Sequence, residues 1–235
     1  MGTVYTKANI LKEVDKWLDP ETVSEFYKQG FVNYRGVTSD TKEKYTEVIA
    51  EQLLDSLDAL ENIERITKAG PYKTPGHKWH PIDPGSPRKE EHIARSMMDH
   101  TYNGIGKIID YQTPLKNVLS DTAGKIDLLS WNEEEGCVYL LELKAPDSTE
   151  TLLRCVLEID TYSRILDFKK LLADFGLPAG TSLRKAALVY QGSRPYADFG
   201  DANVKKLMKA LGVDLFVMDG SSQIVEAHYY EKLEG

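Results

Sequence analysis

Two apolar runs separated by a polar turn decide the fold: Lys125-Ile-Asp127-Leu-Leu-Ser-Trp131 and Cys137-Val-Tyr-Leu-Leu-Glu142-Leu-Lys144, with Asn132-Glu-Glu-Glu-Gly136 between them. This order predicts a β-hairpin. If residues 133–136 form the turn, the numbers of paired residues sum to 269, so that Asp127 lies directly opposite Glu142. Directly opposed side chains on neighbouring strands have Cβ atoms about 4.5–5.5 Å apart. The sequence therefore predicts two close carboxylates inside apolar strands.

Such a pair of acids predicts a bound cation. The two carboxylates repel one another and are costly to bury. A divalent ion removes this cost, because Mg²⁺ and Mn²⁺ prefer hard oxygen ligands. Glu142 and Lys144 are two residues apart in the strand, so both side chains point to one face. Lys144 is therefore expected to reach the pocket in which Asp127 and Glu142 hold the metal, provided that the assumed register is correct.

The chain before the hairpin changes its pattern at a loop. Residues 1–69 read as helices only: one around residues 10–18, a second that opens at Asp19-Pro20-Glu21, and a third over about residues 41–67. Residues 70–87 contain five prolines and three glycines, which predicts a linker. We expect an N-terminal helical region, the linker, and a separate core over residues 88–235.

Residues 88–235 alternate between helical and strand patterns, which predicts an α/β layer. Helices are expected at residues 88–102, 148–175 and 203–211, and strands at residues 107–111, 125–131, 138–144, 184–191, 214–218 and 224–227. Asp147 or Ser148 would cap the long helix, with Glu150 available for a capping box.

Composition narrows the class of protein. The 235 residues carry 29 Lys and Arg against 37 Asp and Glu, a net charge of −8. This balance argues against a surface that is basic throughout, but not against a nuclease with its positive charge confined to one groove. The two cysteines argue against a disulfide framework and against a zinc or iron–sulfur site with four cysteines. No apolar run approaches the length of a membrane span and no secretory signal follows Met1, so we expect a cytoplasmic protein without a membrane partner.

The acids of the hairpin fit a known pattern. Asp127, a gap of 14 residues and then Glu142-Leu143-Lys144 resemble the D…ExK signature of the PD-(D/E)xK nuclease superfamily. The resemblance covers about residues 88–227. The proline–aspartate pair that names the superfamily is absent, because Lys125-Ile126 precede Asp127. On the following helix, Glu158 and Tyr162 resemble the Gln-xxx-Tyr motif of RecB-like members, with Glu in place of Gln.

The resemblance implies a restriction-endonuclease-like core of three layers, α/β/α, with a mixed sheet. It implies an endonuclease or other hydrolase that cleaves phosphodiester bonds, with DNA favoured over RNA. Asp127, Glu142 and the backbone carbonyl of Leu143 would ligate Mg²⁺ or Mn²⁺, and Lys144 would orient the attacking water and stabilise the developing charge.

Members of this superfamily often carry a further acid on the first core helix, and Lys89-Glu90-Glu91 supplies two candidates. Glu90 shares a helical stripe with Ile93, Ala94 and Met97, which would turn it toward the sheet, so Glu90 is preferred as a further catalytic or metal-binding acid. Either glutamate could instead simply stabilise the helix dipole. Substrate contacts are expected from a local basic rim: Lys73, Lys78, Arg88, Arg95, Arg154 and Arg164.

Other interpretations remain open at this level. A lone ExK sequence on a strand is more often a solvent-exposed ion pair, Glu158 could be a solvated helix acid, and Tyr162 could be a plain core residue. The same fold could serve as a module that binds nucleic acid or a nucleotide without cleaving it. It could also be an interaction protein that depends on a partner, with the N-terminal helices docking another protein or a second copy of the chain.

Overall fold

The computed structural model describes residues 5–73, 88–115 and 124–230 of the chain. Within these residues the fold is mixed α/β, built on one seven-stranded sheet in the order β1 to β7. The strands are β1 (Thr101–Tyr102), β2 (Gly106–Pro114), β3 (Lys125–Asn132), β4 (Cys137–Leu143), β5 (Ser182–Tyr190), β6 (Val213–Met218) and β7 (Ile224–His228). Strands β4, β5 and β6 run parallel, and every other neighbouring pair is antiparallel.

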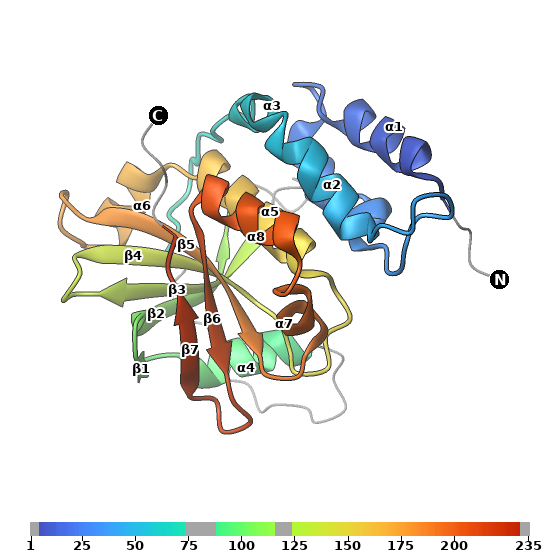
Figure 1. The fold of residues 1–235 in the computed structure, drawn as a ribbon. Coiled ribbons are helices and arrows are strands. Elements are labelled where there is room, and N and C mark those ends of the chain that lie inside the picture. Colours follow the sequence, from blue (N-terminus) through green and yellow to red (C-terminus); the bar gives the residue numbers. More distant parts are fainter. Residues whose placement is uncertain (1–4, 74–87, 116–123, 231–235) are drawn as a thin grey trace.

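Helices cover both faces of this sheet (Figure 1). Parallel neighbours need crossover connections, which here are α5 (Leu152–Ile165) with α6 (Phe168–Phe175), and α7 (Arg194–Asp198) with α8 (Ala202–Leu211). The opposite face is covered by α4 (Lys89–Met97), whose buried Ala94 and Met97 belong to the same apolar cluster as Ile108, Leu128 and Leu141 of the sheet. The hairpin of β3 and β4 therefore lies between two helical layers.

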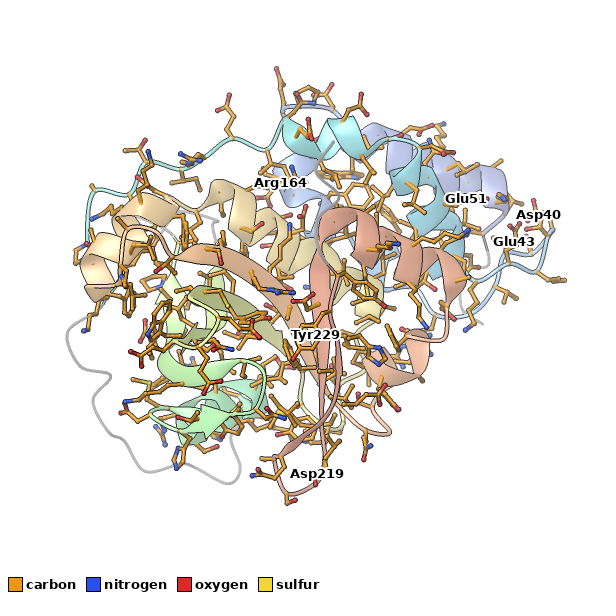
Figure 2. All side chains as sticks on the ribbon, turned by 60° about the vertical axis from the view of Figure 1, so that its left-hand side comes forward. Asp40, Glu43, Glu51, Arg164, Asp219 and Tyr229 are labelled. Atoms are coloured by element: carbon orange, nitrogen blue, oxygen red, sulfur yellow. The ribbon has the colours of Figure 1, made fainter. Side chains whose placement is uncertain are left out.

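The N-terminal region is helical, as predicted, but its second and third expected helices are each replaced by two shorter ones. The helices are α1 (Lys7–Trp17), the 3₁₀ helices η1 (Val23–Lys28) and η2 (Gly30–Asn33), α2 (Tyr45–Leu54) and α3 (Leu57–Glu61). Lys7 ties α1 to α2, because its Nζ donates to Glu43 at 2.9 Å and to Glu51 at 3.3 Å. Figure 2 shows Asp40, Glu43 and Glu51 gathered at this end of the molecule.

These helices share their apolar core with the crossover helices. One continuous cluster of buried side chains joins Ile10, Phe26 and Ile49 to Leu157 of α5 and Val204 of α8. Polar contacts reinforce the junction: the Glu47 carboxylate accepts a hydrogen bond from the backbone N–H of Asn203 at 2.6 Å, at the start of α8. The N-terminal region therefore rests on the helical layer that covers the parallel strands.

Three predicted helices are wrong in length, because tertiary contacts end them. The helix expected over residues 41–67 breaks into α2 and α3, and beyond it the backbone N–H of Ile66 donates to the carbonyl of Ile165 at 2.8 Å instead of continuing a helix. The helix expected over residues 148–175 breaks before α6, where the side chain of Asp167 accepts from the N–H of Lys170. The helix expected to reach residue 102 ends at Met97, and Thr101–Tyr102 form β1.

The predicted cap of the long helix is also wrong. Neither Asp147 nor Ser148 caps it: α5 begins after Thr151, whose hydroxyl oxygen accepts from the N–H of Arg154 at 3.2 Å. The N-terminal region places this cap, because the Thr151 hydroxyl donates to the carbonyl of Val32 at 2.9 Å. Helix α7 was not expected, although Ser193 followed by Pro195 is a typical helix start.

No helix within the described residues is both long enough and apolar enough to cross a membrane.

Candidate functional site

The register of the hairpin is the predicted one. Trp131 pairs with Val138, Leu129 with Leu140, and Leu128 with Leu141, so the numbers of each pair sum to 269. Asp127 and Glu142 come directly after the last of these pairs. The backbone N–H of Leu143 donates to Oδ2 of Asp127 at 3.0 Å, so this carboxylate takes the place of a carbonyl acceptor at the end of the ladder. The sheet thus brings the two acids to one end of the hairpin.

Lys144 is buried between two carboxylates. Its Nζ lies 2.6 Å from Oε1 of Glu142 and 2.9 Å from Oε2 of Glu150. The side chains of Lys144 and Glu142 are only 5% and 4% exposed, which excludes the alternative of a solvent-exposed ion pair. The shared face predicted for Glu142 and Lys144 is confirmed by this contact. Glu150 was expected only as part of a helix cap, and its place beside Lys144 was missed.

The two candidate acids on α4 have different partners. Oε1 of Glu90 accepts a hydrogen bond from the backbone N–H of Ala145, at 3.2 Å, directly after Lys144. Glu91 instead lies 3.3 Å from the guanidinium of Arg88. Glu90 is therefore the acid of α4 that contacts the segment carrying the hairpin residues, as the helical stripe predicted.

Glu158 and Tyr162 form part of a hydrogen-bonded chain behind the hairpin. The hydroxyl of Tyr162 donates to Oε1 of Glu158 at 2.7 Å, and the hydroxyl of Tyr27 in η1 donates to that of Tyr162 at 3.3 Å. The Tyr162 hydroxyl approaches the start of β3 so closely that a Cβ on Gly124 would lie 1.9 Å from it. Tyr162 is thus a core residue whose polar end is fixed on both sides, and the contribution of Tyr27 had no signal in the sequence.

The ionisable groups of the site shift one another's pKa values. Burial raises the pKa of Asp127 to about 7, and burial together with Asp127 and Glu158 raises that of Glu142 well above its usual range. Burial alone would lower the pKa of Lys144, but the facing carboxylates, Glu142 first, outweigh it and hold that pKa well above its usual range.

The pKa of Glu150 is lowered, unlike those of Asp127 and Glu142. Burial alone would raise it, but the positive charges of Lys144 and Arg154 outweigh burial and hold it below the usual value. Several acidic side chains therefore lie close to Lys144 or to one another in this site: Asp127, Glu142, Glu150, Glu158 and Glu90.

A groove of about 800 Å³ opens beside these residues. It is lined by Arg88, Lys89, Glu90, Glu91, Gln112, Lys125, Asp127, Ala145, Asp147, Ser148, Thr149 and Glu150. Asp127 reaches the groove, whereas Glu142 and Lys144 are not among its lining residues and lie deeper. Gln112 of β2 also lines it and donates from Nε2 to Oδ1 of Asp127 at 2.8 Å.

Few of the basic residues expected to contact a substrate meet this groove. Among the members of that group that the structure describes, Arg88 alone lines the groove, and Lys89 and Lys125 line it as well. On α5, the guanidinium of Arg154 pairs with Glu150, and that of Arg164 pairs with Asp160. The Lys73 ammonium lies over the ring of Phe175. Figure 2 shows Arg164 in the helical layer that covers the sheet. Lys78 lies outside the described residues.

The donor chemistry of the site fits a hard divalent cation. Asp127, Glu142 and Glu90 offer carboxylate oxygens, the ligands that Mg²⁺ and Mn²⁺ prefer. A cation of charge +2 would offset the excess of acids, and it would favour the ionised forms of Asp127 and Glu142 over the protonated forms that burial favours. As the side chains stand, no three His, Cys, Asp or Glu residues in the described part of the chain are arranged around one metal position. The fit therefore rests on the kind and charge of the donors.

The raised pKa of Asp127 makes stability depend on pH. The carboxyl titrates near pH 7 in the folded protein but near 3.8 in the unfolded chain, so between these values the folded state binds more protons. Its contribution to the free energy of unfolding therefore falls as pH rises, and levels off above the folded pKa. Without metal, we expect this loss to reach roughly 2–4 kcal/mol. Urea denaturation of wild type and Asp127→Asn across this pH range measures it: wild type should lose more stability than the variant as pH rises, and parallel curves would contradict the raised pKa.

Comparison with protein-family models, with curated proteins and with solved structures found no match for this chain.

Proposed function

We propose that this protein is a metal-dependent nuclease of the PD-(D/E)xK type, with a restriction-endonuclease-like core, that hydrolyses phosphodiester bonds in nucleic acid, DNA in preference to RNA. One observation carries the proposal: Asp127, Glu142 and Lys144 meet at the end of the hairpin, with Glu142 and Lys144 buried and Asp127 half-buried at the groove beside them. A purely structural ion pair of Glu142 and Lys144 gains nothing from a further acid beside Glu142, since each of the two carboxylates disfavours ionisation of the other.

The residues have distinct roles in this proposal. Asp127, Glu142 and the carbonyl of Leu143 would hold Mg²⁺ or Mn²⁺, with Glu90 as a further acid nearby. The bound ion would supply a water of lowered pKa and neutralise charge on the scissile phosphate. Asp127 is the acid of the hairpin that reaches the groove, so the reacting phosphate would lie on its side of the site.

Lys144 acts as a charged donor rather than as a base. The carboxylates around it hold its pKa well above the usual range, so it keeps its proton at neutral pH. A fixed ammonium can orient the attacking water and stabilise the negative charge that develops on the phosphate. Glu150 is a second carboxylate in contact with the Lys144 ammonium, besides Glu142, and so limits the positions that the ammonium can take.

The rim of the groove supplies the contacts to substrate. Lys125 is exposed and lines the groove together with Asp127, and Arg88 lines it from the start of α4. Positive side chains of this kind contact backbone phosphates and place the strand without reading its sequence. Acids outnumber bases in the groove lining by five to three, so the metal would also be needed to offset repulsion of the substrate.

One observation favours a second candidate, a module that binds nucleic acid or a nucleotide without cleaving it. Glu142 and Lys144 are almost fully buried and do not line the groove, so a ligand could occupy the groove without touching either of them.

The experiment that separates the two candidates is a panel of labelled single-stranded DNA, double-stranded DNA and RNA, each incubated with the purified protein and Mn²⁺. We expect cleavage of at least one DNA substrate that stops when the metal is chelated. Binding of a strand without cleavage, with Mn²⁺ shown to be bound, would favour the non-cleaving module instead.

A further inference from the structure

The backbone of β2 takes a left-handed conformation at Gln112, where φ is +51°. Among the described residues it is the one non-glycine residue with positive φ that lies inside a strand, because the others, Lys42, Asp99 and Ser222, lie between elements. Residues with a side chain rarely adopt this conformation, and it persists only where the surroundings impose it. Glutamine has no special tolerance for it, so its contacts have to be the reason.

Strand pairing places Gln112 next to Asp127. Tyr111 pairs with Leu128 and Thr113 with Ile126, so Gln112 lies across from Asp127 in the neighbouring strand. Its amide Nε2 donates to Oδ1 of Asp127 at 2.8 Å. An ionised carboxylate can only accept hydrogen bonds, so the NH₂ side of the amide has to face it. The irregular backbone is thus found at the residue that contacts the groove-lining acid.

Both oxygens of Asp127 are thereby fixed from opposite sides. Gln112 of β2 holds Oδ1, and the N–H of Leu143 in β4 holds Oδ2 at 3.0 Å. Each carboxylate oxygen has two lone pairs, so each keeps one for a further ligand while rotation of the group is restricted. Groups that hydrogen-bond to a ligating side chain in this way set its orientation and its affinity for metal.

We propose that Gln112 is a positioning residue, which holds the Asp127 carboxylate in the orientation that binds the divalent cation. The inference rests on the proposed metal-dependent function, and it adds a residue that the hairpin motif does not contain. The left-handed backbone of Gln112 is retained because it brings the amide to Asp127.

Two variants separate the amide contact from the backbone strain. Gln112→Gly relieves the strain and removes the amide, whereas Gln112→Asn tolerates the left-handed backbone but is one methylene too short to make the same contact. We expect both to fold at least as stably as wild type and to bind Mn²⁺ roughly 10–100-fold more weakly by calorimetry. Lys42→Gly is the matched control, because it relieves a positive φ of 61° at a residue that does not line the groove. It should leave Mn²⁺ affinity unchanged.

Gln112→Glu gives an opposite and independent signal. A carboxylate of the same shape would face Asp127, so without metal the variant should melt at a lower temperature than wild type. On addition of Mn²⁺ its melting temperature should rise by more than that of wild type, because the extra charge favours the cation.

Different results would contradict the role of Gln112 and the proposed metal-dependent function. If wild type binds Mn²⁺ and both Gln112→Gly and Gln112→Asn bind it equally well, Gln112 does not position Asp127, while the proposed function stands. If wild type binds no Mn²⁺ at all, the proposed function is wrong and this inference is wrong with it.

Discussion

Replacing Lys144 with methionine is expected to lower the rate of metal-dependent cleavage by about two orders of magnitude or more, the usual effect of losing one charged contact to a transition state. Methionine keeps most of the aliphatic stem but removes the ammonium that would face the reacting phosphate. Lys125→Met is the matched control. Lys125 is exposed and lines the groove, and it is the first residue of β3, where it pairs with Pro114, the last residue of β2. Its loss should weaken substrate binding only. The measurement is single-turnover cleavage of a DNA strand at saturating Mn²⁺.

The same substitution should also affect stability, because Lys144 compensates two carboxylates. Without the ammonium, Glu142 and Glu150 lose their common partner, and removing one member of a buried ion pair costs about 3–5 kcal/mol. The double variant Lys144→Met, Glu150→Gln removes one of these acids as well and should recover part of the stability, but none of the activity. Wild-type cleavage by either variant would place the chemistry elsewhere.

Converting both hairpin acids to amides is expected to abolish stabilisation by metal. Wild type should gain about 2.7 kcal/mol when Mn²⁺ is present at 100 times its dissociation constant, because the ligand binds only the folded state. The double variant Asp127→Asn, Glu142→Gln should gain almost nothing. Without metal, at pH 8, the amide at position 127 should add stability, since an acid whose pKa is raised to about 7 no longer has to ionise, whereas the amide at position 142 gives up the ion pair with Lys144.

The amide at position 127 fits the existing contacts. Its oxygen can accept from the N–H of Leu143, and its NH₂ can face Gln112 once that amide turns over. Melting curves of both proteins with and without Mn²⁺ provide the measurement. An equal metal-induced shift in the two proteins would mean that the cation binds at another site.

The hairpin could be predicted from sequence because its information is local. Alternating side chains and a short turn fix the register, and a shift of one residue would turn every buried side chain outward. The ends of the helices could not be predicted in this way. Thr151 caps α5, and its hydroxyl donates to the carbonyl of Val32, 119 positions away. Beyond α3, Ile66 donates its backbone N–H to the carbonyl of Ile165 instead of continuing a helix. Such long-range contacts leave no pattern in the local sequence around the helix end.

The same distinction applies to the candidate site. Asp127, Glu142, Lys144 and Glu90 follow from strand alternation and helical spacing, and the structure brings them to one end of the hairpin. Gln112 could not be placed, because the register between β2 and β3 shifts between Ile108 and Asp110 and a regular backbone does not describe the strand. Glu150 lies in the loop after Lys144, and the path of that loop brings it to the ammonium. Tyr27 belongs to the N-terminal region and reaches Tyr162 across 135 positions of sequence.

The central claim is that these acids bind a catalytic divalent cation, and one comparison tests it most directly. A labelled DNA strand is incubated with increasing Mn²⁺ and either wild type or the Asp127→Asn, Glu142→Gln double variant, purified in the same way. The account predicts cleavage by wild type that rises with Mn²⁺ and saturates, and a rate for the variant at least about 100-fold lower. Equal rates for the two proteins, or no cleavage by wild type when Mn²⁺ is bound, would contradict it.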